Sequence, residues 1–392
     1  MSHPAPRSVS TGDAGGAGVE PGGRGRGKRL GRGVLVLLIG VVAVVLAAHL
    51  LLARHFDAPH LQRRLAAAVA RATDSLYLVH IGESRFSLLG RSFRIAGFEL
   101  LPDTAAFRRK GDNPETHTRY TLRAGSLDAR GIGLWRFFRR QIWLASLEVD
   151  SMQLDIRVDR TKPRGEPTPV KLPHQSLQTT KPLRIDRVHL TRSAIRFSER
   201  AIDGVRFGVL PFTDLDAVIS NVSNDPQWMS RARACEIDVR ARFAGAAPLL
   251  VRFDYDLAAP GLNLSYRGSI ARMPASALNP FLVSLEGVRI RDGLLDSADF
   301  QVDVRDDMAR GRLLLLYHDL EIETLDKVSR DRDLSDALHT FIFNHFKLRA
   351  RNPHEDKPAL VAPLAHRRLP ETPLFKFIWL TLRDGVFQTL GL

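Results

Sequence analysis

The side chains that could do acid–base or metal chemistry gather at two places in this 392-residue chain. One is the stretch YHDLEIE, where the alternation of a strand puts His318 and Asp319 on opposite faces, so we do not expect them to share a metal ion. The other, at 354–356, lies between Pro353 and Pro358, a setting typical of a solvated turn. Neither group predicts a catalytic or metal site.

Enzyme motifs are missing elsewhere. The sequence contains no GxSxG, no HExxH and no phosphate-binding loop, and Cys235 is its single cysteine, which excludes an internal disulfide and a CxxC pair. The glycines of GGRGRG follow no predicted strand and precede an apolar segment, so they are not a dinucleotide fingerprint. We therefore expect no enzyme, no cofactor and no metal, and a hydrolase ranks a distant third among possible functions.

The N-terminal region predicts a membrane anchor. Val34–Ala53 contains no Asp, Glu, Lys or Arg, and His49 is its one ionisable residue. A helix of this length spans about 30 Å, the thickness of the hydrocarbon core. Arginines and a lysine precede it, so the positive-inside rule places residues 1–33 in the cytoplasm and the rest outside. Cleavage near Ala47 and Ala48 is the alternative.

The remaining excess of positive charge does not predict nucleic-acid binding. The net charge is +14, but beyond the tail the basic residues alternate with acidic ones along strands instead of clustering. Composition and the positions of glycine and proline predict these segments: a basic tail at 1–33, an anchor at 34–53, a helix with a first β section at 54–158, a proline-rich loop at 159–182, a second β section at 183–325 and a helical cap at 326–392.

A repeated strand pattern dominates the middle of the chain. In SLEVDSMQLDIRVD, at 146–159, apolar residues follow one another at steps of two, five and two, and RVHLTRSAIRFSER, at 187–200, repeats those steps. Period-two alternation with a break in the middle predicts two short strands joined by a turn or bulge, with one face leaving water. A third copy of the two-then-five step begins at Val288.

Further strands surround these copies. CEIDVRARF, LVRFDYDL and LNLSYRGSI predict an antiparallel meander between Cys235 and Ile270, and RLLLLYHDLEIE, apolar on both faces at its start, predicts a covered central strand. A helix with a Leu61, Leu65, Val69 stripe precedes the strands, and GIGLWRFFRR predicts a helical turn packed on the sheet. Helices are also expected over 331–348 and from Pro373 onward, the latter covering one end of the sheet, with docking on a bilayer or partner as the alternative.

Strands with one apolar and one polar face can bury their apolar side chains in two ways. They can face each other as a filled sandwich, which physical chemistry alone favours, or they can line the inside of a curled sheet that holds something else. Both arrangements need the same inward residues, so periodicity leaves the choice open. The expected fold class is mainly β with flanking helices: an N-terminal transmembrane helix, an elongated, curled, groove-like antiparallel sheet and C-terminal helices.

The order of features resembles the AsmA-like family of Gram-negative envelopes. The resemblance rests on the anchor, the helix LQRRLAAAVARAT, the strands through FRIAGFEL, the segment AGSLDARGIGLWRFFRRQIWLASLEVDSMQLDIRVD and the stretch YRGSIARMPASALNPFLVSLEGVRI. It implies an inner-membrane anchor, a periplasmic body with an elongated apolar β-groove, and a part in phospholipid transport or outer-membrane homeostasis. It implies no catalytic residues.

The only site residues that the resemblance implies are the apolar residues on one face of each strand. We expect the following positions to line the groove or the core: Leu147, Val149, Leu154, Ile156, Val188, Leu190, Ile195, Phe197, Val239, Phe243, Val251, Phe253, Leu262 and Leu264. The expected partners are phospholipid, the inner membrane and other envelope proteins, without nucleic acid. The alternative function is an envelope scaffold or assembly factor with a filled β-sandwich and no lipid cargo.

Overall fold

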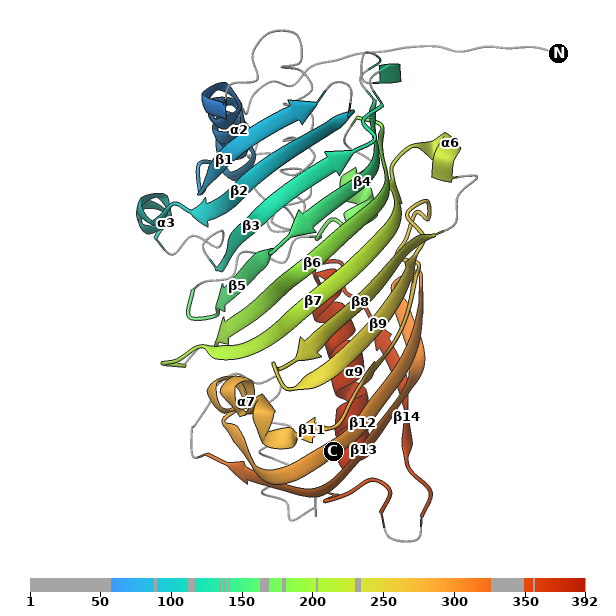
Figure 1. The fold of residues 1–392 in the computed structure, drawn as a ribbon. Coiled ribbons are helices and arrows are strands. Elements are labelled where there is room, and N and C mark those ends of the chain that lie inside the picture. The colour runs from blue at the N-terminus through green and yellow to red at the C-terminus, as the bar shows by residue number, and fades with distance from the viewer. Residues whose placement is uncertain are drawn as a thin grey trace, which may run out of the picture.

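The fold is mainly β. A computed structural model describes residues 58–87, 90–111, 117–133, 135–136, 139, 141–162, 169–177, 181–201, 204–229, 234–325, 349–354 and 357–391. Within them a single 14-stranded sheet contains every named strand (Figure 1). The apolar faces of the strands therefore belong to one curled sheet and not to the two facing sheets of a sandwich.

The strands follow the chain closely. Their bounds are β1 (Tyr77–Ser87), β2 (Ser92–Pro102), β3 (Thr118–Arg130), β4 (Ile142–Asp150), β5 (Gln153–Asp159), β6 (Leu183–Arg200), β7 (Gly208–Ser223), β8 (Cys235–Phe243), β9 (Ala247–Tyr255), β10 (Leu264–Ile270), β11 (Met273–Pro274), β12 (Val288–Arg305), β13 (Met308–Thr324) and β14 (Val361–Arg367). The order in the sheet is β1-β2-β3-β4-β6-β7-β8-β9-β10-β12-β13-β14, with β5 beside β3 and β6, and β11 beside β12.

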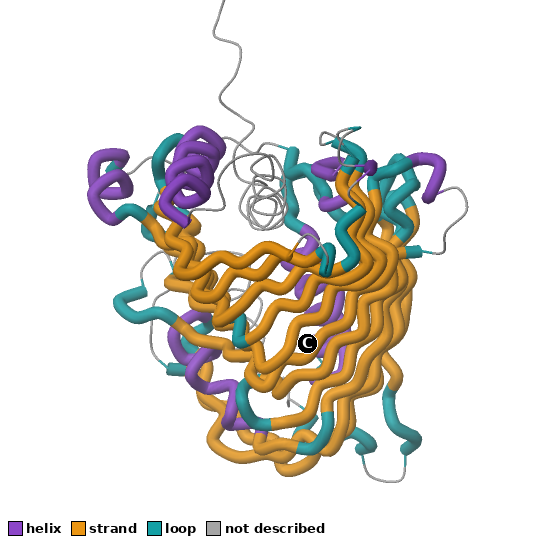
Figure 2. Tube along the Cα trace, turned by 45° about the horizontal axis from the view of Figure 1, so that its top comes forward, coloured by secondary structure: helices purple, strands orange, loops and turns teal. Residues whose placement is uncertain are grey.

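Helices lie at the ends and on one face of this sheet. They are α2 (Ala58–Thr73), α3 (Thr104–Lys110), α5 (Pro173–Leu177), α6 (Pro226–Met229), α7 (Asn279–Leu285) and α9 (Leu374–Leu390), with a 3-10 turn at Ala275–Leu278. The sheet curls, and α9 lies against its concave face (Figures 1 and 2). None of the helices among the described residues is long and apolar enough to cross a membrane.

The sheet is mixed, which corrects the expectation of a purely antiparallel one. β6 pairs in parallel with both β4 and β5, while all other pairs are antiparallel. The cause is the connection at 160–182, which returns the chain to the end of the sheet where β4 began. β6 then runs beside β4 and β5 in turn, because these two strands form one line interrupted at Ser151.

The repeated step of two and five residues marks a kink in the backbone each time. In the first copy Ser151 has φ 55° between β4 and β5, and in the second Arg192 has φ 50° at a register shift within β6. In the third, Gly293 has φ 133° within β12, again at a register shift. The predicted break is present in all three, because a residue with positive φ lets the strand bend and resume its alternation. Only the first copy is two separate strands, whereas the second and third lie within single 18-residue strands, which corrects the expectation of two short strands there.

Other predicted elements are confirmed. β8, β9 and β10 form the antiparallel meander, and β13 lies between β12 and β14 as the doubly apolar run indicated. In α2 the stripe of Leu61, Leu65 and Val69 is buried. Gln62 on the same helix accepts a bond from Ile81 N at 2.8 Å and donates to Val79 O, so α2 also covers backbone groups on the free edge of β1.

The C-terminal segment is not only helical. α9 begins directly after Pro373, as predicted, but it is preceded by β14, an edge strand that the sequence pattern did not reveal. β14 contains Pro363 and only a short alternation, so it lacks the usual strand signal. The predicted anchor at 34–53 and the predicted helix at 331–348 lie outside the described residues.

Candidate functional site

The predicted apolar positions lie on one face of the sheet. Residues directly opposite each other in neighbouring strands point to the same side. Across β4, β6, β7, β8 and β9, Val149 faces Leu190, Leu190 faces Ala217, Ala217 faces Val239 and Val239 faces Val251. The same registers place on this face the other predicted strand residues: Leu147, Leu154, Ile156, Val188, Ile195, Phe197, Phe243, Phe253 and Leu264. Leu262 lies just before β10 and is fully buried.

Burial is uneven along this concave face. The inward residues Leu147, Val149, Val188 and Leu264 are buried. Many inward residues of β5–β9 are only half-buried. We define these half-buried, adjoining residues of β5–β9 as the central patch: Leu154, Ile156, Leu190, Ile195, Phe197, Phe212, Ile219, Ile237, Val239, Phe243, Val251 and Phe253. The central patch is an apolar surface on the concave side that the described parts of the chain cover incompletely.

Three members of the central patch were not among the predicted groove positions. They are Phe212, Ile219 and Ile237, and each lies directly opposite another apolar residue of the face. The alternation of CEIDVRARF does predict that Ile237 shares a face with Val239, so the signal for Ile237 was present. In β7 the alternation is interrupted by a register shift near Asp214, which hid the common face of Phe212 and Ile219.

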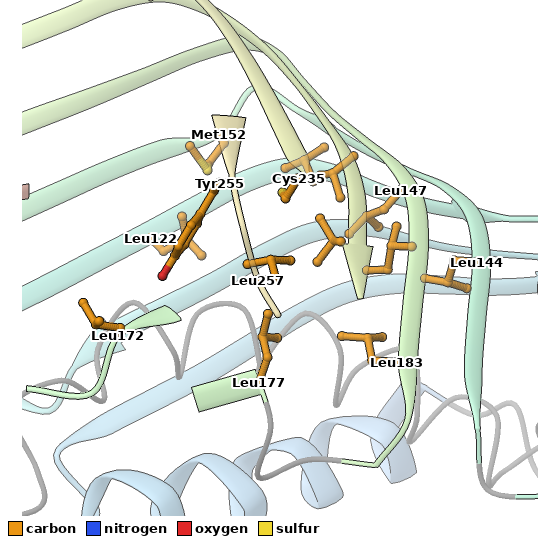
Figure 3. Close-up of a cluster of buried hydrophobic side chains, with 14 of the residues drawn as sticks. Leu122, Leu144, Leu147, Met152, Leu172, Leu177, Leu183, Cys235, Tyr255 and Leu257 are labelled. Atoms are coloured by element: carbon orange, nitrogen blue, oxygen red, sulfur yellow. The ribbon is translucent and has the colours of Figure 1, made fainter. Parts of the chain in front are cut away.

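The proline-rich segment covers the concave face on the side of β4 and the start of β6. It was expected to be a loop or linker of little hydrophobicity, but Leu172 and Leu177 are buried in the cluster that includes Leu147, Leu183 and other apolar residues (Figure 3). Val170 N donates to Pro370 O at 2.8 Å, which joins this segment to the connection between β14 and α9. Two apolar side chains were therefore enough to make part of the predicted linker a cover.

Helix α9 covers the concave face on the side of β10–β14. Its residues Phe377, Thr381 and Thr389 have no exposed surface, and Gly385 is buried beside them. The two threonine hydroxyls donate to backbone carbonyls one turn earlier, so they are satisfied within the helix. A Cβ added to Gly385 would lie 2.4 Å from Leu364 Cδ2, which shows how closely this side of α9 approaches the sheet.

The opposite side of α9 borders the central patch. Phe375 and Trp379, one turn apart, are 55% and 38% exposed. The ring of Phe375 lies 6.0 Å from that of Phe197, and Trp379 lies 6.2 Å from Phe281 on α7. These aromatic rings extend the apolar surface of the central patch onto two helices.

The convex face is charged and internally paired. Arg192 contacts Asp150 through two nitrogens at 2.9 and 2.6 Å, and these bonds hold the pKa of the Asp150 carboxyl well below its ordinary range. Burial raises the pKa of Asp159, but bonds from Arg200 and Thr161 outweigh it and leave the pKa lowered. Cross-strand ion pairs of this kind are typical of a solvated sheet face.

Titratable groups do not assemble a reactive centre among the described residues. His318 Nδ1 lies 2.7 Å from Asp296 Oδ2, and His366 Nδ1 lies 2.8 Å from Asp384 Oδ2; each carboxylate also contacts an arginine, Arg272 and Arg383 respectively. No three His, Cys, Asp or Glu side chains in the part of the chain that the structure describes converge as metal ligands. Burial, followed by the charge of Glu236, raises the pKa of the Cys235 thiol to about 12, far from that of a nucleophilic cysteine.

The arrangement as described offers an apolar surface on one side of the sheet. Its main surface is aliphatic and aromatic, it is built on a rigid sheet, and its charged groups are on the other side. Comparison of the chain with protein-family models and with curated proteins finds no match to either.

Proposed function

We propose that this protein is an inner-membrane-anchored periplasmic protein that binds phospholipid on the concave face of its sheet and serves in phospholipid transport or outer-membrane lipid homeostasis. The observation that carries this proposal is the central patch: a continuous apolar surface, inside a curled sheet, that remains half-buried while both flanks are covered. The apolar segment at 34–53 and the resemblance to AsmA-like proteins support the location and the lipid class.

The energetics favour acyl chains as occupants. Each methylene removed from water contributes roughly 0.8 kcal/mol, so a single acyl chain resting on the central patch gains several kcal/mol. Neighbouring positions along β6 to β9 offer the same type of contact, so a bound chain moves between them without a large barrier. The headgroup remains at the open side, since the concave residues of the patch offer it no charge.

The sharpest test places a photo-crosslinking amino acid on either face of one strand. Val251 belongs to the central patch, and its neighbour Leu250 is 51% exposed on the convex face. In full-length protein irradiated in cells, we expect lipid adducts at position 251 and few at position 250, identified by mass spectrometry of the labelled peptide. Because the adduct is read at one residue, lipids held elsewhere by the chain do not contribute.

A second measurement separates occupancy from labelling efficiency. Val239→Trp fills the patch with an apolar side chain, and a charged substitution at Leu250 serves as a convex control of the same strand pair. Adducts at 251 should fall severalfold with Val239→Trp and persist with Leu250→Asp. Equal adducts on both faces, or none at 251 in a folded protein, would reject lipid binding by the patch.

The alternative is an envelope scaffold without lipid cargo. The cover formed by Leu172 and Leu177 and the docking of α9 favour it to some extent, because both fill parts of the concave face with the protein's own side chains. In that case crosslinks at position 251 would join the patch to another segment of the chain or to a second protein, which the same mass analysis identifies.

A further inference from the structure

Three of the four tryptophans of the chain lie at one rim of the sheet. At this rim β3 leads into β4, β6 begins, and β7 leads into α6, which is at the upper right of Figure 1. Backbone bonds join the pieces: Gly133 N donates to Trp143 O at 3.0 Å, and Ile142 N donates to Pro182 O at 2.8 Å. We define the tryptophan–arginine rim as Trp135, Arg136, Arg139, Trp143, Arg184 and Trp228.

Four of these residues form a stack of alternating rings and cations. The Arg184 guanidinium carbon lies 3.1 Å from the ring centre of Trp228 and 4.5 Å from that of Trp143. The guanidinium carbon of Arg136 lies 3.4 Å from the ring centre of Trp143. Such contacts are favourable because the ring face is electron-rich, and they fix the direction in which the short segment at 135–136 projects.

The stack leaves polar groups unsatisfied. The indole N–H groups of Trp143 and Trp228 are buried and have no acceptor. Arg184 is engaged by Asp186 at 2.6 Å, whereas no ion pair involves Arg136 or Arg139 among the described residues. The Asp225 carboxylate nearby accepts a bond from Gln227 N. Arg136 also donates to Gln141 Oε1 at 3.4 Å, so Arg136 and Arg139 present positive charge at the rim without a carboxylate partner among the described residues.

Trp135 extends from this stack into solvent. Its side chain is 71% exposed, although the sequence predicted that it packs on the sheet, and its contact with Arg139 spans 5.9 Å. An exposed indole beside arginines that lack a carboxylate partner is the composition of a membrane interface: tryptophan favours the headgroup layer, and arginine binds phosphate oxygens through its planar donors. Water alone would make the exposure of this large ring unfavourable.

We propose that the tryptophan–arginine rim docks on the surface of an anionic phospholipid bilayer, with Trp135 in the headgroup layer and Arg136 and Arg139 on lipid phosphates. This role uses none of the residues of the central patch, so it holds or fails independently of lipid carriage. Docking at this rim sets which ends of β3, β4 and β6 face the membrane. The 18-residue β6 then leads away from it for up to roughly 60 Å.

The test uses the full-length protein in lipid nanodiscs whose acyl chains carry bromine, which quenches tryptophan fluorescence at short range. Discs contain phosphatidylcholine with or without phosphatidylglycerol. We expect stronger quenching in the anionic discs, and Trp135→Phe should remove most of the added quenching. Every protein in this test also carries Trp379→Phe, because this residue lies on α9 beside the central patch, where bound lipid would add its own quenching.

The arginines are tested in the same discs. Each basic residue near an anionic surface contributes about fivefold to binding, so Arg136→Gln/Arg139→Gln should lower the docked-to-free ratio roughly 25-fold, while the corresponding lysine pair should retain most of it. Circular dichroism verifies that each variant is folded. Quenching that survives Trp135→Phe, or that is equal or absent in both kinds of disc, overturns the proposal.

Discussion

The concave face over β5–β9 and the concave face over β10–β14 are built from the same alternation, yet only one is closed by a helix. Over β10–β14 the inward positions include Ala309, Gly311 and Ala362, and α9 lies close against them with its own Gly385. Over β5–β9 the residues of the central patch are valine, leucine, isoleucine and phenylalanine and remain half-buried, although Ala217 and Ala241 between them are buried.

The difference teaches that the close approach of a helix, and not the polarity of the face, distinguishes a closed part of the face from an open one. Small residues allow a helix to approach the sheet at close range, because less side-chain volume stands between the two backbones. Large residues hold a cover farther away and leave apolar atoms with fewer neighbours. The four predictions below test this comparison, from the largest expected effect to the smallest.

Truncating one leucine in each region should give unequal losses of stability. Leu364 is 3% exposed under α9, so Leu364→Ala should lower the free energy of unfolding by about 3 kcal/mol, through lost burial and a cavity. Leu154→Ala, in the half-buried central patch, should cost about half as much or less. Chemical denaturation of the full-length variants measures both, and equal losses would mean that the two regions are equally closed.

A larger side chain at the point where α9 contacts the sheet should weaken the docking of this helix. A Cβ at Gly385 already meets Leu364 Cδ2 at 2.4 Å and Leu313 Cδ2 at 3.1 Å, so Gly385→Val should cost about 2 kcal/mol through overpacking. Gln388→Val on the exposed side of the same helix controls for helix propensity and should cost about 0.5 kcal/mol. If the two variants lose the same free energy of unfolding, the close contact at Gly385 does not determine the docking of α9.

Acid should weaken the convex face behind both regions. Burial raises the pKa of Asp159, behind the central patch, but bonds from Arg200 and Thr161 outweigh it and leave the pKa lowered in the folded state. The pKa of Glu323, on β13, is lowered by Arg291 against the opposing effect of burial. A carboxyl group whose pKa is lower in the folded than in the unfolded protein stabilises the fold. This contribution is complete above the unfolded-state pKa of about 4 and is lost as the pH falls through the folded-state pKa. The melting temperature should therefore decrease below about pH 4.

The Asp159→Asn variant provides the control for this pH dependence. It should lose stability near neutral pH and show a smaller decrease in acid, because one of the titrating groups has been removed. A full acid response in this variant would place the responsible carboxylates elsewhere on the sheet.

The last prediction involves no change in stability and concerns Cys235, at the covered end of the concave face. Its pKa of about 12 leaves almost no thiolate at pH 8, and its side chain is buried in the cluster of Figure 3. A maleimide reagent should label the folded protein orders of magnitude more slowly than a cysteine in a peptide. Rapid labelling would show that the cover of Leu172 and Leu177 opens readily, so that this region resembles the central patch.

Much of the fold could be predicted from the sequence, and the failures have specific causes. Alternation located the strands of the meander and thirteen of the proposed apolar positions on one face, because a side-chain period of two is a local property. Parallel pairing of β6, the strand β14 and the cover at Leu172 were missed. Each depends on where a connection returns the chain, which local pattern does not encode.

By itself the sequence determined that the chain is mainly β, that its strands have one apolar face, and where those strands kink, since these follow from residue type and period. Only the tertiary structure decided that the strands form one curled sheet, that α9 covers β10–β14 and not the central patch, and that Trp135 projects from a stacked rim. Those outcomes depend on contacts between residues far apart in the chain, where shape and volume, and not periodicity, select the partner.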